Sequence, residues 1–204
     1  MFHLMFSLPC LLVLVRWLWP LPLSTKSKVA SAVVLVLVSQ YHLWSRLSSG
    51  SVFSPEFPKG LVILFNWGFG AILLLAVFQL LVDAGTLIAM AIRRRRVAIA
   101  PRLRYGIAIA AALLAALGVN QAIKSPSLED VLIEVKNLPH EFDGYQVVHL
   151  TDLHISRLFD APWTRKVVAD ANALDADLIV ITGDLIDGNI AHRERDVAPL
   201  RDLR

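Results

Sequence analysis

The sequence is poor in charge and in cysteine. Only 18% of its 204 residues are charged and 56% are hydrophobic, whereas a soluble domain has about 25% charged and about 45–50% apolar residues. These proportions exclude a disordered chain, which needs low hydrophobicity and a high net charge, and they argue against a plain soluble globule. The single cysteine, Cys10, excludes an internal disulfide framework and a cysteine-rich zinc site.

Acidic residues are almost absent from the first 123 positions. This part holds 11 Lys and Arg but only two acids, Glu56 and Asp83, whereas residues 124–204 hold 9 basic and 15 acidic residues. The net charge of +3 therefore conceals one part of +9 and one of −6. Such an asymmetry predicts two parts in different surroundings. Because the basic excess flanks apolar runs, it gives no argument for nucleic acid, and we expect none as a partner.

Long uncharged runs separate the basic residues of the first part. Residues 61–82 form the firmest membrane span, since 22 uncharged residues at 1.5 Å rise cross a hydrocarbon core of roughly 30 Å. The first of the candidate spans is doubtful, and Arg16 within it can snorkel to an interface. The sequence thus predicts a membrane region over 1–123 with about four transmembrane helices, at approximately 1–19, 29–45, 61–82 and 105–123.

The connecting loops predict the orientation of these spans. The loop 93–104 carries six arginines, whereas the loop 46–60 has two basic residues and one acid. Because basic loops stay in the cytoplasm, we expect a multi-pass protein of the cell membrane whose C-terminal domain is extracytoplasmic. A polybasic tract can instead bind nucleic acid or anionic lipid. Asp83 lies near the end of its span, which favours an interfacial position, so we interpret the spans as anchor and scaffold.

The second part alternates strand and helix patterns. Residues 124–130 are typical of a polar linker, and residues 131–204 are typical of the beginning of an α/β domain. A helix opening at Asp160 and Pro162 separates two apolar runs, which predicts a βαβ unit with parallel strands. The expected strands are Val131–Lys136, which alternates as a half-buried strand, Tyr145–Leu150 and Leu178–Thr182.

Polar residues follow the last two expected strands directly. Asp152 and His154 follow one strand, and Gly183 and Asp184 follow the next. In open α/β sheets ligands bind at the carboxyl ends of parallel strands, and an extended Asp-x-His pair presents both side chains to one face. Carboxylate and imidazole together suit divalent Mn, Fe or Zn, while Gly183 permits a close approach of backbone or ligand. Alone each motif is more typical of a turn or cap; together they favour a metal site.

The blocks VVHLTDLHIS and LIVITGDLIDG resemble the first two motifs of the calcineurin-like binuclear metallophosphoesterases, and the preceding helices and basic loop resemble the membrane-anchored branch of that family. The resemblance implies that Asp152 and His154 bind a first metal, that Asp184 bridges two divalent ions, and that Asp187 supports the motif loop. It implies hydrolysis of a phosphomono- or diester by a bridging hydroxide. The later motifs G-N-H-[DE] and G-H-x-H do not occur before Arg204, so we expect a truncated, N-terminal part of the domain.

Two functional hypotheses remain. The first is a membrane-anchored, metal-dependent phosphoesterase whose lipid- or envelope-derived substrate is suggested by location alone, with the present chain itself inactive. The alternative is a non-catalytic membrane anchor or interaction protein with a degenerate half-domain. Of the remaining histidines, His149 is expected as a packed or hydrogen-bonded core imidazole and His192 as solvent-facing.

Overall fold

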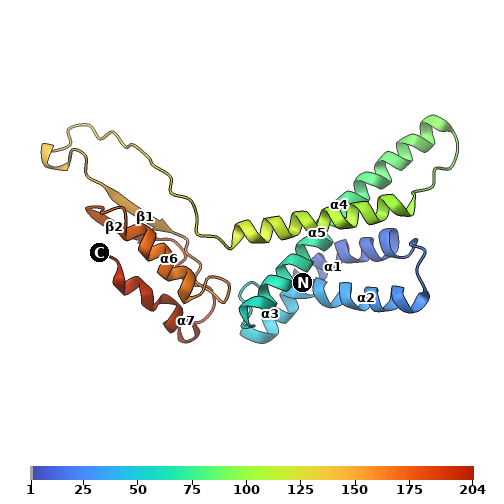
Figure 1. Cartoon of the computed structure of the whole chain (residues 1–204), viewed down its shortest axis with the longest axis horizontal. Coiled ribbons are helices and arrows are strands. Elements are labelled where there is room, and N and C mark those ends of the chain that lie inside the picture. The colour runs from blue at the N-terminus through green and yellow to red at the C-terminus, as the bar shows by residue number, and fades with distance from the viewer. Residues whose placement is uncertain (1) are drawn as a thin grey trace. The chain divides into compact units, whose positions relative to one another are not determined.

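The computed structural model describes residues 2–204, with side chains from Ser7 onward. The chain forms two compact units, one ending at Ala122 and one beginning at Ile123 (Figure 1). The first unit is helical and the second is a small α/β unit. The sequence-based fold class, an apolar helical region followed by the start of an α/β domain, is confirmed.

Unit 1 contains two helices that are long and apolar enough to cross a membrane, within the part of the chain that the structure describes. The expected spans 61–82 and 105–123 fall largely within these two helices. The expected span 29–45 is divided at Gln40, where one helix ends and the next begins. The helices are α1 (Phe2–Leu12), the π-helical η1 (Val13–Leu18), α2 (Thr25–Ser39), α3 (Tyr41–Ser49), α4 (Lys59–Arg93) and α5 (Pro101–Ala122).

Glycines let α4 pack closely against its neighbours. A Cβ atom on Gly68 would lie 2.9 Å from Cγ1 of Val38 in α2, and one on Gly70 would lie 3.6 Å from Cβ of Ala115 in α5. Small residues at such contacts allow apolar helices to approach each other. The buried core of the unit comprises Cys10, Val13, Ile72, Leu75, Ala76 and Ala111.

Unit 2 is built on a two-stranded parallel sheet. β1 (Val147–Thr151) pairs with β2 (Leu178–Thr182), with Val147 opposite Leu178 and Thr151 opposite Thr182. The crossover helix α6 (Ala161–Asn172) begins after Asp160 and buries Val167 against the sheet-end residues Leu153 and Ile155. The expected parallel βαβ unit is therefore confirmed. The remaining elements are η2 (His140–Phe142), α7 (Ile190–Val197) and η3 (Ala198–Asp202).

The expected strand Val131–Lys136 is wrong. This segment has no regular structure, and Leu132 and Ile133 are 89% and 75% exposed. A strand needs a neighbour for its N–H and C=O groups. The described residues contain one sheet, in which β1 and β2 pair only with each other. Alternating hydrophobicity marks a face that can be buried, but it supplies neither the covering layer nor the hydrogen-bonding partner.

Candidate functional site

The two motif loops leave the sheet side by side. Beyond the paired ends of β1 and β2, the N–H of Asp152 donates to the carbonyl of Thr182 at 3.1 Å, and that of His154 donates to the carbonyl of Asp184 at 3.0 Å. The pairing continues to a parallel bridge between Ile155 and Ile186. Residues 30 positions apart in the sequence are thus held next to each other by backbone hydrogen bonds.

The backbone of the Asp152–His154 segment is left-handed rather than extended. Asp152 has φ 50° and His154 has φ 45°, and Gly183 opposite them has φ 70°. Non-glycine residues adopt such angles infrequently, and the strain is held in place by surrounding structure, a pattern that concentrates at functional sites. The expectation that an extended backbone turns both side chains to one face is therefore wrong. Their placement follows instead from two left-handed residues.

The carboxylate of Asp152 is oriented by two donors. Its Oδ1 accepts a hydrogen bond from the N–H of Asp184 at 3.1 Å, and its Oδ2 accepts one from the hydroxyl of Thr151 at 2.6 Å. These bonds, that from Thr151 first, hold the pKa of Asp152 below its usual value. A Cβ atom on Gly183 would lie 2.2 Å from Oδ1. Glycine is thus required here both by its positive φ and by the nearby carboxylate.

His154 is held by Asp187 across the two loops. Nδ1 of His154 donates to Oδ1 of Asp187 at 2.8 Å, because a carboxylate can only accept. This hydrogen bond is the main reason that the pKa of His154 is raised. With Nδ1 occupied, Nε2 is the ring nitrogen left for another ligand. The structure thus brings together the His of the first motif and the last Asp of the second.

Two threonines extend the network and were missed from the sequence. His149 Nε2 lies 2.6 Å from the hydroxyl oxygen of Thr182, which donates to the hydroxyl of Thr151 at 3.3 Å, and Thr151 donates to Asp152. The expected hydrogen bonding of His149 is confirmed, but its expected burial is wrong, since the residue is exposed. The available signal was that Thr151 and Thr182 hold equivalent positions, each ending its strand directly before a motif.

A buried arginine supports the loop from behind. Arg193 in α7 is fully buried, and its Nε donates to the carbonyl of Asp187 at 2.9 Å. Its neighbour Asp196 accepts a hydrogen bond from the N–H of Ala161 at 3.1 Å, at the start of α6. The polar sequence of α7 resembles a solvated surface helix, so sequence reasoning missed both contacts. His192, expected to face solvent, is exposed.

The donor chemistry fits a divalent metal, although the described side chains do not close around one. Among the side chains that the structure describes, from Ser7 to Arg204, no three His, Cys, Asp or Glu converge as a metal-binding group. Asp152 and His154 nevertheless supply a carboxylate and an imidazole, which Mn, Fe and Zn accept, and Asp184 adds a second carboxylate one residue beyond the glycine. The hydrogen bond from Asp184 to Asp152 shows how close the two motifs lie.

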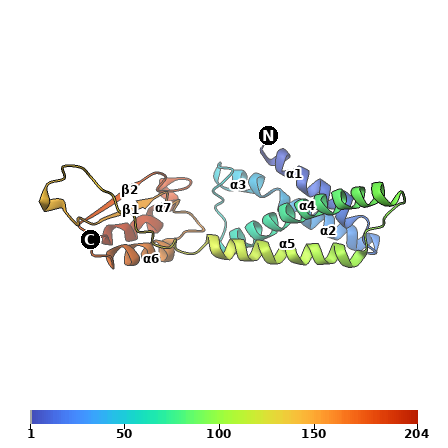
Figure 2. The ribbon, with the colours of Figure 1, turned by 90° about the horizontal axis from the view of Figure 1, so that it is seen from above.

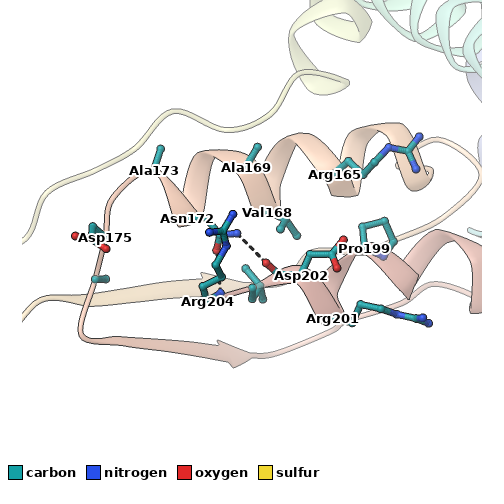
Figure 3. A pocket seen from close by; sticks show the side chains of 12 residues that line it. Arg165, Val168, Ala169, Asn172, Ala173, Asp175, Pro199, Arg201, Asp202 and Arg204 are labelled. Atoms are coloured by element: carbon teal, nitrogen blue, oxygen red, sulfur yellow. Dashed lines mark hydrogen bonds between the residues drawn. The ribbon is translucent and has the colours of Figure 1, made fainter.

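The hollow found in unit 2 lies elsewhere. It has a volume of about 940 Å³ and lies between α6 and the C-terminal residues (Figure 3). Asn172 links its two sides, since it donates to the carbonyl of Asp202 at 2.8 Å and accepts from the N–H of Arg204 at 3.0 Å. None of the strand-end motif residues lines this hollow, so it is separate from the candidate site.

The paired parallel strands end in the Asp-x-His and Gly-Asp-x-x-Asp loops whose sequences resemble metallophosphoesterase motifs. The comparisons lead to the same class. The chain has distant, partial homology to metallophosphoesterases, including transmembrane proteins that carry such a domain. No family model matches the chain, and no solved structure matches it significantly.

Three relatives illustrate the extent of the match. A transmembrane protein with metallophosphoesterase domain from Danio rerio is 31% identical over 96 residues, 47% of this chain and 22% of the relative. Its counterpart from Bos taurus is 29% identical over 128 residues, 62% of this chain and 28% of the relative. The uncharacterized metallophosphoesterase YkuE of Bacillus subtilis is 37% identical over 68 residues, 32% of this chain and 24% of the relative.

The chain spans about a quarter of the length of the curated relatives that it matches. Unit 2 covers residues 123–204, and the 128-residue match to the Bos taurus protein is longer than this unit. That match must therefore extend into the helical unit. The likeness to the transmembrane relative is not confined to the motif-bearing part.

Proposed function

We propose that the chain is the membrane-anchored, N-terminal part of a metal-dependent phosphoesterase that hydrolyses a phosphomono- or diester. The observation that carries the proposal is the pairing of the two motif loops, with Asp152 hydrogen-bonded to the backbone of Asp184 at the carboxyl edge of a parallel sheet. The partial homology to metallophosphoesterases supports the same reaction class.

Two divalent ions of Mn, Fe or Zn are the cofactors of this proposal. Asp152 and His154 would hold the first ion, and the carboxylate of Asp184 would be shared with the second. When bound, such ions polarise the phosphoryl group and lower the pKa of water towards neutrality. The chain's own contribution is to present carboxylate oxygens and an imidazole nitrogen at the strand ends.

The surrounding residues act by orienting these donors. Thr151 and the N–H of Asp184 hold the Asp152 carboxylate in its ionised form. Asp187 holds Nδ1 of His154, so the tautomer with a free Nε2 lone pair is favoured once the ring is neutral. Metal-ligating histidines commonly use their second nitrogen in this way, and loss of the outer partner typically weakens metal affinity by about 10- to 100-fold.

The helical unit would anchor this domain in the cell membrane. Its two long apolar helices and its transmembrane relatives suggest membrane insertion. The basic connections α1–α2 and α4–α5 lie at the same end of the unit (Figures 1 and 2), as expected if that end is cytoplasmic. The C-terminal domain would then be extracytoplasmic, within reach of phosphoesters of the lipid or envelope.

Reporter fusions test this topology. Fusions after residue 124 should report the outside of the membrane, and fusions within 93–104 should report the cytoplasm. A reversed pattern contradicts the proposed orientation, whatever number of spans precedes α4.

Hydrolysis of a generic phosphodiester by the full-length protein, with the coding sequence read past Arg204, tests the activity. With Mn²⁺ added, Asp184→Asn should lower the rate at least about 100-fold, because a neutral amide bridges two cations poorly. Glu194→Gln, which removes an exposed carboxylate on α7, should leave the rate unchanged. Equal rates for wild type and Asp184→Asn would favour the alternative of a non-catalytic anchor with a degenerate domain.

A further inference from the structure

Cations from two distant segments gather at one end of unit 1. The connections α1–α2 and α4–α5 lie far apart in the sequence, but both views place them at the same end of unit 1 (Figures 1 and 2). Residues 16–28 and 93–104 contain no acidic residue. At the opposite end, the connection from α3 to α4 carries Glu56 beside Lys59. Apart from Arg16, the exposed cations of the basic end are Lys26, Arg93, Arg94, Arg95, Arg96 and Arg102.

A polar network ties the elements that carry these cations. Arg16 in η1 donates to both carboxylate oxygens of Asp83 in α4, at 2.9 and 3.0 Å. Arg16, expected to reach an interface, is thus paired with an acid of α4. Arg104 in α5 donates to the carbonyl of Arg16, and the indole N–H of Trp17 donates to the carbonyl of Arg104 at 2.8 Å. η1, α4 and α5 are thus joined at the first turn of α5 and at Asp83, ten residues before the end of α4.

This network leaves the basic end without a counter-charge. Glu56 and Asp83 are the two acids of residues 1–123. The carboxylate of Asp83 accepts from Arg16 and, at 2.8 Å, from Gln79 Nε2. Within the described chain, none of the six exposed cations named above forms an ion pair. Arg104 adds a further buried positive charge, at 7% exposure. The field at this end is therefore positive, and its complement is an anion.

Apolar and aromatic side chains lie among these cations. Trp19 is 65% exposed, and Nζ of Lys28 lies 5.6 Å from the centroid of its ring. Leu103, between Arg102 and Arg104, is 48% exposed. Tryptophan beside lysine is typical of a membrane interface, where the ring and the cation meet headgroups. A nucleic acid would gain from the charges but not from the exposed aliphatic side chains.

We propose that this basic end, defined by the six exposed cations with Lys28 and Trp19, binds the headgroups of anionic phospholipids in the leaflet that faces it. The inference rests on the proposed membrane insertion of unit 1. A cation near an anionic leaflet is worth about 1 kcal/mol, or about a fivefold change in the association constant. The network centred on Arg16 and Asp83 makes the two segments one binding surface rather than two.

The test uses the whole chain in nanodiscs that contain phosphatidylcholine with phosphatidylglycerol. Brominated forms of either lipid quench tryptophan fluorescence, and Trp17 and Trp19 lie at the basic end, so quenching yields the relative association constant of the two lipids. We expect a preference for phosphatidylglycerol of at least about fivefold, lost at about 1 M salt, where the Debye length is about 3 Å. Both orientations in a nanodisc face the same lipid, so a change of topology does not affect the result.

The variant R93Q/R94Q/R95Q/R96Q should reduce the preference at least about fivefold. The matched control R165Q/R195Q/R201Q/R204Q removes four exposed arginines from unit 2 and should keep it. Equal association constants in the wild type, or an equal loss in the control, overturns the proposal. So does tight binding of a short oligonucleotide to phosphatidylcholine discs that R93Q/R94Q/R95Q/R96Q abolishes. A chain that does not enter the discs contradicts membrane anchoring instead.

Discussion

The two units of the chain place their charged side chains differently. In unit 1, Arg104 is buried in an apolar bundle, and six exposed cations gather at the basic end, while Arg46 in α3 is a further exposed cation. In unit 2, Arg193 is buried behind a loop, while the carboxylates of Asp152 and Asp184 stay exposed at the end of a sheet. Buried arginines therefore hydrogen-bond to backbone carbonyls in both units. The exposed charges are those that we propose to meet a membrane surface in one unit and metal ions in the other.

Under the proposed function, unit 2 contributes to phosphoester hydrolysis and unit 1 anchors it. The largest expected effect tests whether unit 2 alone suffices for hydrolysis. Expressed as it stands, the 204-residue chain should hydrolyse a generic phosphodiester at least about 100-fold more slowly than the full-length protein, because it offers candidate ligands for one ion and a bridge but no further set for the second. Rates of both proteins with added Mn²⁺ provide the measurement. Comparable rates would show that the candidate ligands within this chain are enough for hydrolysis.

Removal of the buried charge of unit 2 should have the next largest effect. Arg193→Met deletes the donors that hold the carbonyl of Asp187 and the contact to Asp196, which should cost about 3 kcal/mol of local stability. Hydrogen exchange of the full chain, followed by mass spectrometry, should then be about 100-fold faster in the α7 segment and unchanged in α4. Arg195→Met, which removes an exposed cation from the same helix, should leave both rates unaltered; a matching acceleration there would rule out the role of Arg193.

A smaller effect is expected at Gly183, whose backbone lies close to the carboxylate of Asp152. Gly183→Ala places a Cβ atom 2.2 Å from Oδ1 of Asp152 and strains a residue with φ 70°, so the carboxylate must move. The Mn²⁺ affinity of the full-length protein, measured by titration, should fall at least about tenfold. Gly144→Ala is the matched control, since Gly144 has φ 77° but no atom within 4 Å of the added Cβ. Equal losses in the two variants would mean that strain alone, and not Asp152, accounts for the effect.

The smallest effect concerns an exposed ion pair of unit 2. Lys166 Nζ lies 2.8 Å from Oδ2 of Asp170, and this hydrogen bond, helped by Ser125, holds the pKa of Asp170 below its usual value. A lowered pKa in the folded state means that the stabilisation is present above the unfolded pKa and is lost as the pH falls through the folded one. Lys166→Met should therefore raise the pKa of Asp170 in a carboxyl NMR titration and cost at most about 0.5 kcal/mol near neutral pH. An unchanged titration would show that the pair is not formed in solution.

The sequence predicted the elements that local pattern determines. Leu178–Thr182 was delimited correctly because its β-branched run ends at a glycine, and α6 because Asp160 and Pro162 open it. The length of the uncharged runs 61–82 and 105–123 alone predicted most of α4 and α5. The prediction of a strand over 131–136 was wrong because a strand needs a hydrogen-bonding partner, and no local pattern shows whether that partner exists.

The candidate site was only partly predictable for a similar reason. The motif spacing placed Asp152 next to Asp184, as the hydrogen bond between them shows. The left-handed angles of Asp152 and His154, the donor role of Thr151 and the burial of Arg193 depend on contacts between segments far apart in the sequence. Likewise, the ion pair between Arg16 and Asp83 could not be predicted, because the two residues lie 67 positions apart in the sequence.

The metal content of the full-length protein tests the central claim most directly. Purified wild-type protein should contain two divalent ions per chain by elemental analysis. Asp184→Asn should lose both, and Asp152→Asn should lose chiefly one, because Asp184 would be shared and Asp152 would serve the first ion. Wild-type metal content and activity in both variants would contradict the assignment of the strand-end loops as the metal centre.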